Sequence, residues 1–212
     1  GYEKRVDWIQ KEIEVPEKVP EKLVHFANLI KEKYELSTLK AKTAKQITPY
    51  AKSMFHTLNA SFKHLYGFVP LTDKQIEYYV KQYFSIIKPE FVCLVINKQQ
   101  DVVGFGVSMP SLSKALMKAN GHLFPFGFIH ILKSLYGKND VIDMYLNGVH
   151  PDYQSKGVHA IYYADIMQSY INNGIKFAIT NPQMEDNSRA LQLWKHYKHR
   201  DHIRRRCYVK HF

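Results

Sequence analysis

Apolar residues recur along this chain at two different spacings, and the two spacings come in separate blocks. Alternation or short apolar runs predict strands over residues 6–15, 36–41, 91–96, 102–108, 141–149, 176–180 and 203–209. Recurrence every three or four residues predicts helices over residues 20–34, 43–66, 72–88, 111–118, 124–136, 158–170 and 187–198. The order is helices, then a strand hairpin, then strand–helix–strand–helix–strand. It is typical of a mixed α/β layer fold around one central sheet.

Composition narrows the class of protein. The chain has 212 residues, of which 45% are hydrophobic, enough to bury a core. No apolar run reaches the roughly 18 residues of a membrane-spanning helix, and the start does not resemble a signal peptide. Cys93 and Cys207 lie far apart in strand-like surroundings, which favours a reduced, cytoplasmic protein. The scattered histidines argue against a metal site.

The net charge of +11 produces a basic field that attracts anions. Much of the charge gathers near the end of the chain, at Lys195, Lys198, Arg200, Arg204, Arg205, Arg206 and Lys210. An anionic cofactor, a nucleic acid and a plain solvated basic face all remain open. Nucleic acid is the least favoured partner, because the three consecutive arginines alternate between the two faces of a strand.

The most informative stretch covers residues 148–160. An apolar strand leads into it, a short basic loop with Gly157 follows, and a helix begins directly afterwards. The first N–H groups of a helix have no partner inside the helix and lie at its positive end. Such a junction is suited to a phosphate or pyrophosphate group.

Two motifs resemble those of the GNAT acyltransferase superfamily. Residues 149–159 read Val-His-Pro-Asp-Tyr-Gln-Ser-Lys-Gly-Val-His, close to the cofactor loop of that superfamily, with His159 where Gly or Ala is usual. Residues 187–194 read Asn-Ser-Arg-Ala-Leu-Gln-Leu-Trp, where Trp194 replaces the usual Tyr. The resemblance covers residues from about 40 to 212 and is strongest to uncharacterised bacterial proteins that look like tandem GNAT halves.

The resemblance implies a GNAT-type fold, with a mostly antiparallel central sheet, a splayed parallel strand pair and flanking helices. Residues 41–212 would form the GNAT-like domain. Residues 1–40 would be a strand–helix segment, with Gly1-Tyr2-Glu3-Lys4 as the closing strand of a preceding half. Because the chain does not begin with methionine, we expect a fragment or a tag remnant. Contact with a preceding half or a homodimer would follow.

The resemblance also implies the site and its ligand, which is acetyl-CoA or another acyl-CoA. The expected cofactor-binding residues are Val149, Gln154, Ser155, Lys156, Gly157, Val158, His159 and Asn187. Val149 would donate its N–H to the thioester oxygen, and the loop would hold the pyrophosphate. Asn187 serves equally well as a helix N-cap. Asp143 is the candidate base, and Tyr145 lies on the same strand face.

The expected function is therefore an N-acyltransferase that moves an acetyl or longer acyl group from acyl-CoA to a primary amine. A CoA-binding or structural half without chemistry is the alternative, because Trp194 cannot act as the usual acid. The apolar insert over residues 111–136 has two interpretations. It packs into the core, or it receives a greasy acceptor or a long acyl chain.

Overall fold

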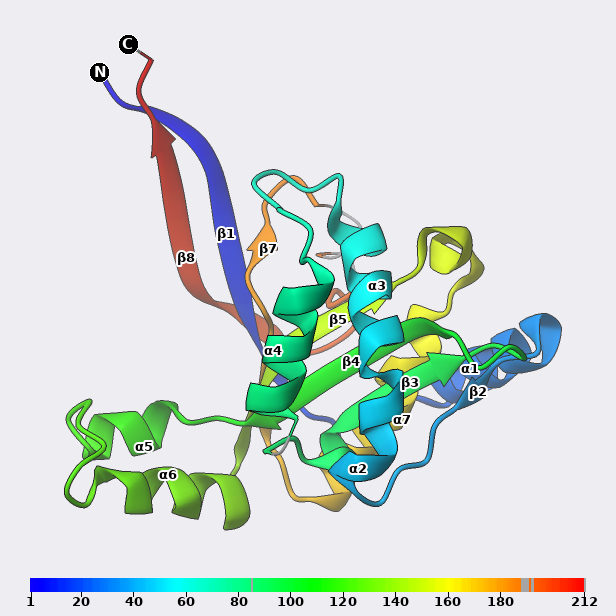
Figure 1. Ribbon diagram of the computed structural model, residues 1–212, viewed down its shortest axis with the longest axis horizontal. Helices are drawn as coiled ribbons and strands as arrows, with labels where there is room; N and C mark the ends of the chain where they lie inside the picture. The colour runs from blue at the N-terminus through cyan, green and yellow to red at the C-terminus, as the bar shows by residue number, and fades with distance from the viewer. Residues whose placement is uncertain (85, 188–190, 192, 212) are drawn as a thin grey trace. The chain divides into compact units, whose positions relative to one another are not determined.

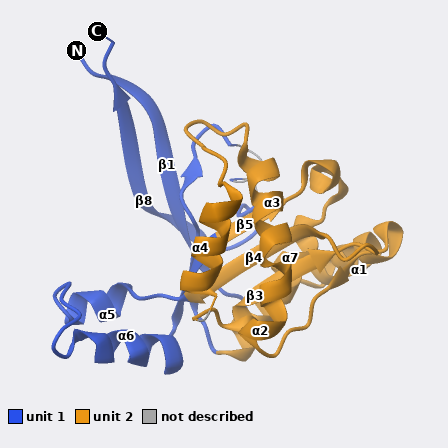
Figure 2. Ribbon diagram, in the orientation of Figure 1, with its two compact units in different colours: residues 1–16, 110–145, 174–212 blue, residues 17–109, 146–173 orange. Residues whose placement is uncertain are grey.

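The computed structural model describes residues 1–84, 86–187, 191 and 193–211. Its contacts divide the chain into two compact units, and neither unit is one continuous stretch of sequence (Figure 2). Unit 1 contains residues 1–16, 110–145 and 174–212, and unit 2 contains residues 17–109 and 146–173. Strand β5 (Val141–Val149) begins in unit 1 and ends in unit 2.

Unit 2 is built on a sheet that has helices on both of its faces (Figure 1). The strands follow the order β2 (Ser37–Thr38), β3 (Val92–Ile96), β4 (Val102–Pro110) and the end of β5. β2 pairs with β3, and β3 with β4, in antiparallel fashion. This confirms the hairpin predicted between residues 91 and 108.

One face of this sheet is covered by α2 (Ala44–Ile47), α3 (Ala51–Phe62) and α4 (Asp73–Tyr83), with a 3-10 turn, Thr48–Tyr50, between the first two. Met54, Leu58 and Ile76 are buried there with Leu94 and Phe105 of the strands. The single long helix predicted over residues 43–66 is interrupted, since Pro49 lacks the N–H that a continuous helix needs at that position. Thr72 caps α4 as the sequence indicates, and accepts a hydrogen bond from the N–H of Gln75.

The other face carries α7 (His159–Asn172), which also packs against α1 (Glu21–Tyr34). Two glycines of β4 allow the close approach of α7. A Cβ at Gly104 would lie 2.7 Å from Val158 Cγ1, and one at Gly106 would lie 2.5 Å from Ile166 Cδ1. The core therefore holds the helix that follows the predicted cofactor loop directly on the sheet.

Unit 1 is organised around β1 (Glu3–Glu14). Along one edge β1 pairs antiparallel with β8 (His199–Val209), and along the other it pairs antiparallel with β6 (Phe177–Ile179) and β7 (Gln183–Met184). The start of β5 pairs with β6 in parallel. The helices α5 (Ser113–Lys118) and α6 (Gly127–Tyr136) precede β5 and lie side by side as a helical hairpin (Figure 2).

The mixed α/β fold class is confirmed, including the parallel strand pair in a mostly antiparallel sheet. β7 was not predicted, and β8 begins at His199 rather than near Ile203. The predicted helix over residues 187–198 falls partly on residues 188–190 and 192, which lie outside the described residues. The domain boundary near residue 40 stays a prediction.

Candidate active site

The loop that links β5 to α7 lies wholly in unit 2. Residues 151–156 form a 3-10 turn, Gly157 takes a left-handed conformation with φ +77°, and α7 begins at His159. The sequence placed a helix start near Val158, so the predicted strand–loop–helix order is confirmed. The described part of the chain offers no acceptor to the N–H groups of Val158 and His159. Two donors at the positive end of a 14-residue helix thus remain for a ligand.

The loop side chains hold its shape and its charge. Gln154 is exposed, yet its Nε2 donates to the carbonyl oxygen of Val149 at 3.2 Å and braces the turn. The ammonium of Lys156 lies 4.4 Å from the ring centroid of Tyr153 and 5.1 Å from that of Tyr34. Ser155 is exposed at the tip. These rings fix one cation beside the start of α7.

Gly157 is buried by α1. A Cβ at this position would lie 2.8 Å from the ring of Phe26 and 3.5 Å from Ile30 Cδ1. The resemblance makes Gly157 part of a loop that would hold the pyrophosphate, whereas the group that a Cβ at Gly157 would meet in the structure is the aromatic ring of Phe26. Burial also lowers the pKa of the neighbouring His159, which therefore favours the neutral imidazole.

Val149 closes β5 with its N–H directed away from β4. The following residue, His150, donates its N–H to the carbonyl of Val103 in β4 at 2.9 Å. Successive N–H groups of a strand point to opposite edges, so the N–H of Val149 points to the other edge. The carbonyl of Val149 accepts from Ser61 Oγ at 2.7 Å, which fixes the peptide plane. This is the orientation that a hydrogen bond to a ligand on that edge requires.

The parallel pairing of β5 stops early. The last pair of residues in register is Asp143 and Ile179, whereas β5 continues to Val149. In the described residues, the later part of β5 has no pairing with β6. The backbone N–H and C=O groups along such an unpaired strand edge can form hydrogen bonds with an extended ligand that carries amide groups.

A cavity of about 290 Å³ in unit 1 is lined by both predicted catalytic residues, Asp143 and Tyr145. The same cavity is also lined by Gln10, Ser113, Met144, Ile179, Thr180, Asn181, Pro182, His202, Ile203 and Arg205. Burial raises the pKa of the Asp143 carboxyl, although a hydrogen bond from Ser111 and the charge of His202 act in the opposite direction. Burial, and then the charge of Asp143, raise the pKa of Tyr145.

Three lining residues were not found by sequence reasoning. The Oδ1 atom of Asn181 is buried and has no hydrogen-bond partner among the described residues, although Asn181 lines the cavity. Arg205 brings a guanidinium group, which donates a hydrogen bond to Gln10 Oε1, and His202 brings an imidazole ring. A buried amide oxygen without a hydrogen bond destabilises the folded protein. Asn181 Oδ1 is therefore a candidate to accept a hydrogen bond from a ligand. The only sequence signal for Asn181 is the run of polar residues after β6.

The second motif is only partly described. Asn187 accepts at its backbone oxygen from the N–H of Leu191 at 3.1 Å, whereas the motif positions 188–190 and 192 lie outside the described residues. Trp194 is 1% exposed, and its Nε1 donates to Gln183 Oε1 at 3.3 Å. The indole therefore fills the core of unit 1 where the superfamily carries a tyrosine. The role of Asn187 toward a cofactor stays a prediction.

Among the described residues, no group of three His, Cys, Asp or Glu side chains is arranged to hold a metal ion.

Comparison with known proteins gives likenesses in structure alone. No protein-family model matches the chain, and no curated protein sequence matches it. The GCN5-related N-acetyltransferase from Sphaerobacter thermophilus is similar, with a TM-score of 0.57 and 12% identity over 97% of this chain and 53% of that one. The GCN5-related glucosamine N-acetyltransferase region of a fungal multi-domain GH3 β-N-acetylglucosaminidase matches with a TM-score of 0.57 and 11% identity, over 97% of this chain and 21% of that chain.

A tandem GNAT protein from the clavulanic acid biosynthesis pathway is also similar, with a TM-score of 0.50 and 10% identity over 97% of this chain and 53% of that one. The chain thus spans about half, or less, of the length of these proteins. Identities of 10–12% show the fold and leave substrates open. On these likenesses, the chain has the fold of the GCN5-related N-acetyltransferases, as its two motifs predict.

Proposed function

We propose that this chain is an N-acyltransferase that moves an acetyl or longer acyl group from acyl-CoA to a primary amine. The observation that carries this function is the cavity around Asp143 in unit 1, where a carboxyl of raised pKa stands beside a phenol. A carboxylate that binds protons more tightly than usual is a better base for an ammonium group. The fold supplies the precedent for acyl transfer, as an analogy.

Acyl-CoA would be bound by unit 2. The free N–H groups of Val158 and His159 and the cation of Lys156 fit the charge of a pyrophosphate. The outward N–H of Val149 would hold the thioester oxygen as negative charge develops on it. The bound cofactor supplies an activated thioester, and the remaining steps belong to the protein.

The acceptor would lose its proton to Asp143, directly or through a water, and its nitrogen would then attack the thioester carbon. The C–N bond forms, the C–S bond breaks, the thiolate leaves, and the attacking nitrogen gives its second proton to the solvent. Trp194 cannot donate a proton to that thiolate, because its only N–H is engaged in the core. CoA thiolate is a good enough leaving group to depart without one.

The cavity also indicates which amines fit. His202 and Arg205 line the same cavity as Asp143, and the buried Asn181 Oδ1 has no hydrogen-bond donor among the described residues. A small molecule with an ammonium at one end and a carboxylate or phosphate at the other would satisfy all of these groups. We therefore favour a small zwitterionic amine over a polyamine.

Two measurements test this function separately. Acetyl-CoA at about 100 times its dissociation constant should stabilise the protein by about 2.7 kcal/mol, and Lys156→Ala should weaken that effect while Lys63→Ala, on an exposed lysine of unit 2, should not. Thiol release should then appear with zwitterionic amines and fall by about 10²–10⁴-fold in Asp143→Asn. If no acyl-CoA stabilises the protein, the proposal that it binds acyl-CoA is contradicted.

The alternative is a CoA-binding half without chemistry, and the buried Trp194 is the observation that favours it. Stabilisation by CoA without thiol release for any amine would support that alternative. A nucleic-acid module gains nothing from the arginine run, because Arg204 and Arg206 both pair with Asp7 while Arg205 lines the cavity.

A further inference from the structure

The α5–α6 hairpin, residues 111–139, displays an apolar surface to solvent. Its most exposed apolar side chains are Phe124, Met117 and Phe126, at 81%, 77% and 70% exposure. Further exposed apolar side chains of the hairpin are Leu116, Leu123, Phe128, Ile129, Leu132 and Tyr136. The interpretation of this insert as core packing is wrong for these residues. Exposed apolar groups gathered this densely mark an interaction surface.

The hairpin is anchored to unit 1 at its base. Ser134 Oγ and Asn139 Nδ2 both donate to the carbonyl of Ser111, at 2.8 and 2.9 Å. Ala115 of α5 and Leu135 of α6 are buried. At the far end the turn is tight, since Phe128 donates its N–H to the carbonyl of Leu123 at 2.8 Å. The apolar side chains are therefore displayed by an ordered element.

Charge on the hairpin has a single sign. Residues 111–139 contain four lysines, Lys114, Lys118, Lys133 and Lys138, and no aspartate or glutamate. Lys114 pairs with Asp140 at 2.9 Å. The described part of the chain places no carboxylate within ion-pair distance of the other three lysines. The apolar side chains of the hairpin thus lie among four lysines, three of which have no carboxylate within ion-pair distance in the described residues.

We propose that the α5–α6 hairpin docks on an anionic lipid surface. Apolar side chains would enter the boundary between headgroups and acyl chains, while the lysines meet anionic headgroups and lay their alkyl stems along the apolar surface. A second copy of this chain is a poor occupant, because two chains that each carry a net charge of +11 repel one another. The hairpin also has no acidic residue that could pair with the lysines of a second hairpin. Lysine is also depleted from protein–protein interfaces.

The docking is at the surface of the bilayer. The longer of the two helices, α6, has 10 residues, about 15 Å in length. Within the described residues, every helix is too short or too polar to pass through a bilayer. Two short helices beside each other place their apolar side chains only at interfacial depth.

Vesicle sedimentation tests this docking with the full chain. We expect the protein to sediment with vesicles of phosphatidylcholine and phosphatidylglycerol, and far less with phosphatidylcholine alone. The double variant Phe124→Ser/Phe126→Ser should lose most of the binding. Lys118→Gln/Lys133→Gln should weaken it by about fivefold per lysine. Val69→Ser, which removes a 77% exposed apolar side chain of unit 2, is the matched control and should bind like the wild type.

Circular dichroism and the melting temperature of each variant establish that it is folded before vesicles are added. Absence of binding to anionic vesicles would overturn the docking. So would unchanged binding of the phenylalanine double variant, since the overall charge alone would then explain adsorption. A concentration-dependent dimer that the same double variant abolishes, without vesicle binding, would assign the surface to a second copy instead.

Discussion

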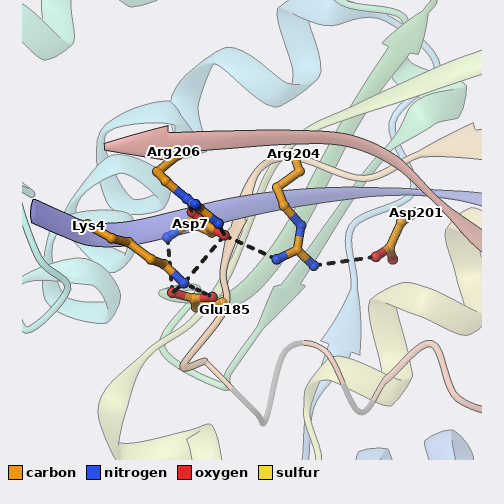
Figure 3. Close-up of polar contacts among 6 residues, drawn as sticks. All are labelled: Lys4, Asp7, Glu185, Asp201, Arg204 and Arg206. Carbon is orange, nitrogen blue, oxygen red and sulfur yellow. Dashed lines mark hydrogen bonds and ion pairs between the residues drawn. The ribbon is translucent and has the colours of Figure 1, made fainter. Parts of the chain in front are cut away.

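Arg206 forms a two-pronged ion pair with Asp7 across the β1–β8 strand pair, with Nε–Oδ1 and Nη2–Oδ2 distances of 2.8 and 3.0 Å (Figure 3). The side chain of Asp7 is fully inaccessible to solvent, and Arg204 and Lys4 reach the same carboxylate at 3.1 and 3.4 Å. Glu185 completes the cluster by accepting from Lys4 Nζ and from the N–H of Asp7. Three cations thus surround one inaccessible carboxylate, and the two arginines of β8 join β8 to β1.

The first prediction concerns the pH dependence of unfolding. Hydrogen bonds from Arg206 and then Arg204 hold the pKa of Asp7 well below its ordinary value of 3.8. Because the folded pKa is depressed, the stabilisation is present above pH 3.8 and is lost as the pH falls toward the folded pKa. Asp7→Asn should therefore lower the melting temperature at pH 7, and the difference from wild type should shrink in acid.

Thermal denaturation between pH 2 and 7 measures this. Glu12→Gln is the matched control, since Glu12 pairs with Arg200 on the same two strands and keeps 17% of its side-chain surface exposed. We expect a smaller loss in the control, because a paired carboxylate without access to water leaves its cations uncompensated when it is removed. Equal losses in both variants would contradict a special role for Asp7.

Gly157 provides the second prediction. Its φ of +77° disfavours a side chain, and an added Cβ would also meet the Phe26 ring at 2.8 Å. Gly174 has φ +69° with no atom within 4 Å of such a Cβ. Gly174→Ala should cost about 1–2 kcal/mol of unfolding free energy through backbone strain alone, and Gly157→Ala should cost more. Denaturant unfolding of both variants measures the difference.

The clash can be separated from the strain by a double-mutant cycle. In a Phe26→Ala background, the cost of Gly157→Ala should fall toward that of Gly174→Ala. If the cost stays the same in that background, the contact with α1 does not matter, and the glycine is required for φ or for a ligand.

The sequence predicted those parts of the structure that depend on neighbours along the chain. The apolar run before Val149, the turn glycine at Gly157 and the Thr72 cap each act within a few residues, so strand, loop and helix appeared where the pattern placed them. Asp143 and Tyr145 were placed on one strand face, and both line one cavity in the structure, while their catalytic role stays a prediction.

The spacing of apolar residues does not predict which residues far apart in the sequence pair with one another. Asp7 and Arg206 lie 199 residues apart, and the sequence placed the arginines on a basic strand without indicating their partner. His202 and Arg205 reach the Asp143 cavity because β8 pairs with β1, which no local spacing reveals. The exposed Phe124 was equally hidden, because hydrophobicity alone does not distinguish a core side chain from an interaction surface.

The two cysteines should differ in reactivity, which is the third prediction. Cys93 is fully buried, and burial raises the pKa of its thiol well above the ordinary value, so little thiolate is available. Cys207 is partly exposed on β8. An aromatic disulfide reagent should titrate one thiol quickly in the folded protein and two after denaturation. Cys207→Ser should abolish the fast reaction; a fast phase that survives would show that Cys93 is reached.

The last prediction separates a catalytic Asp143 from a structural one. Burial raises its pKa above 3.8, so the folded protein binds this proton more tightly than the unfolded chain does. Its contribution to stability is therefore full below the unfolded pKa and is lost as the pH rises through the folded pKa. At pH 7 the charged, partly buried carboxylate destabilises the folded state, so Asp143→Asn should raise the melting temperature while lowering turnover by about 10²–10⁴-fold. The kcat/KM of the wild type should fall in acid with a midpoint above 3.8, because only the unprotonated carboxylate accepts the proton of the amine. A variant with a lower melting temperature and an unchanged pH profile would show that Asp143 holds the strand in place and takes no part in proton transfer.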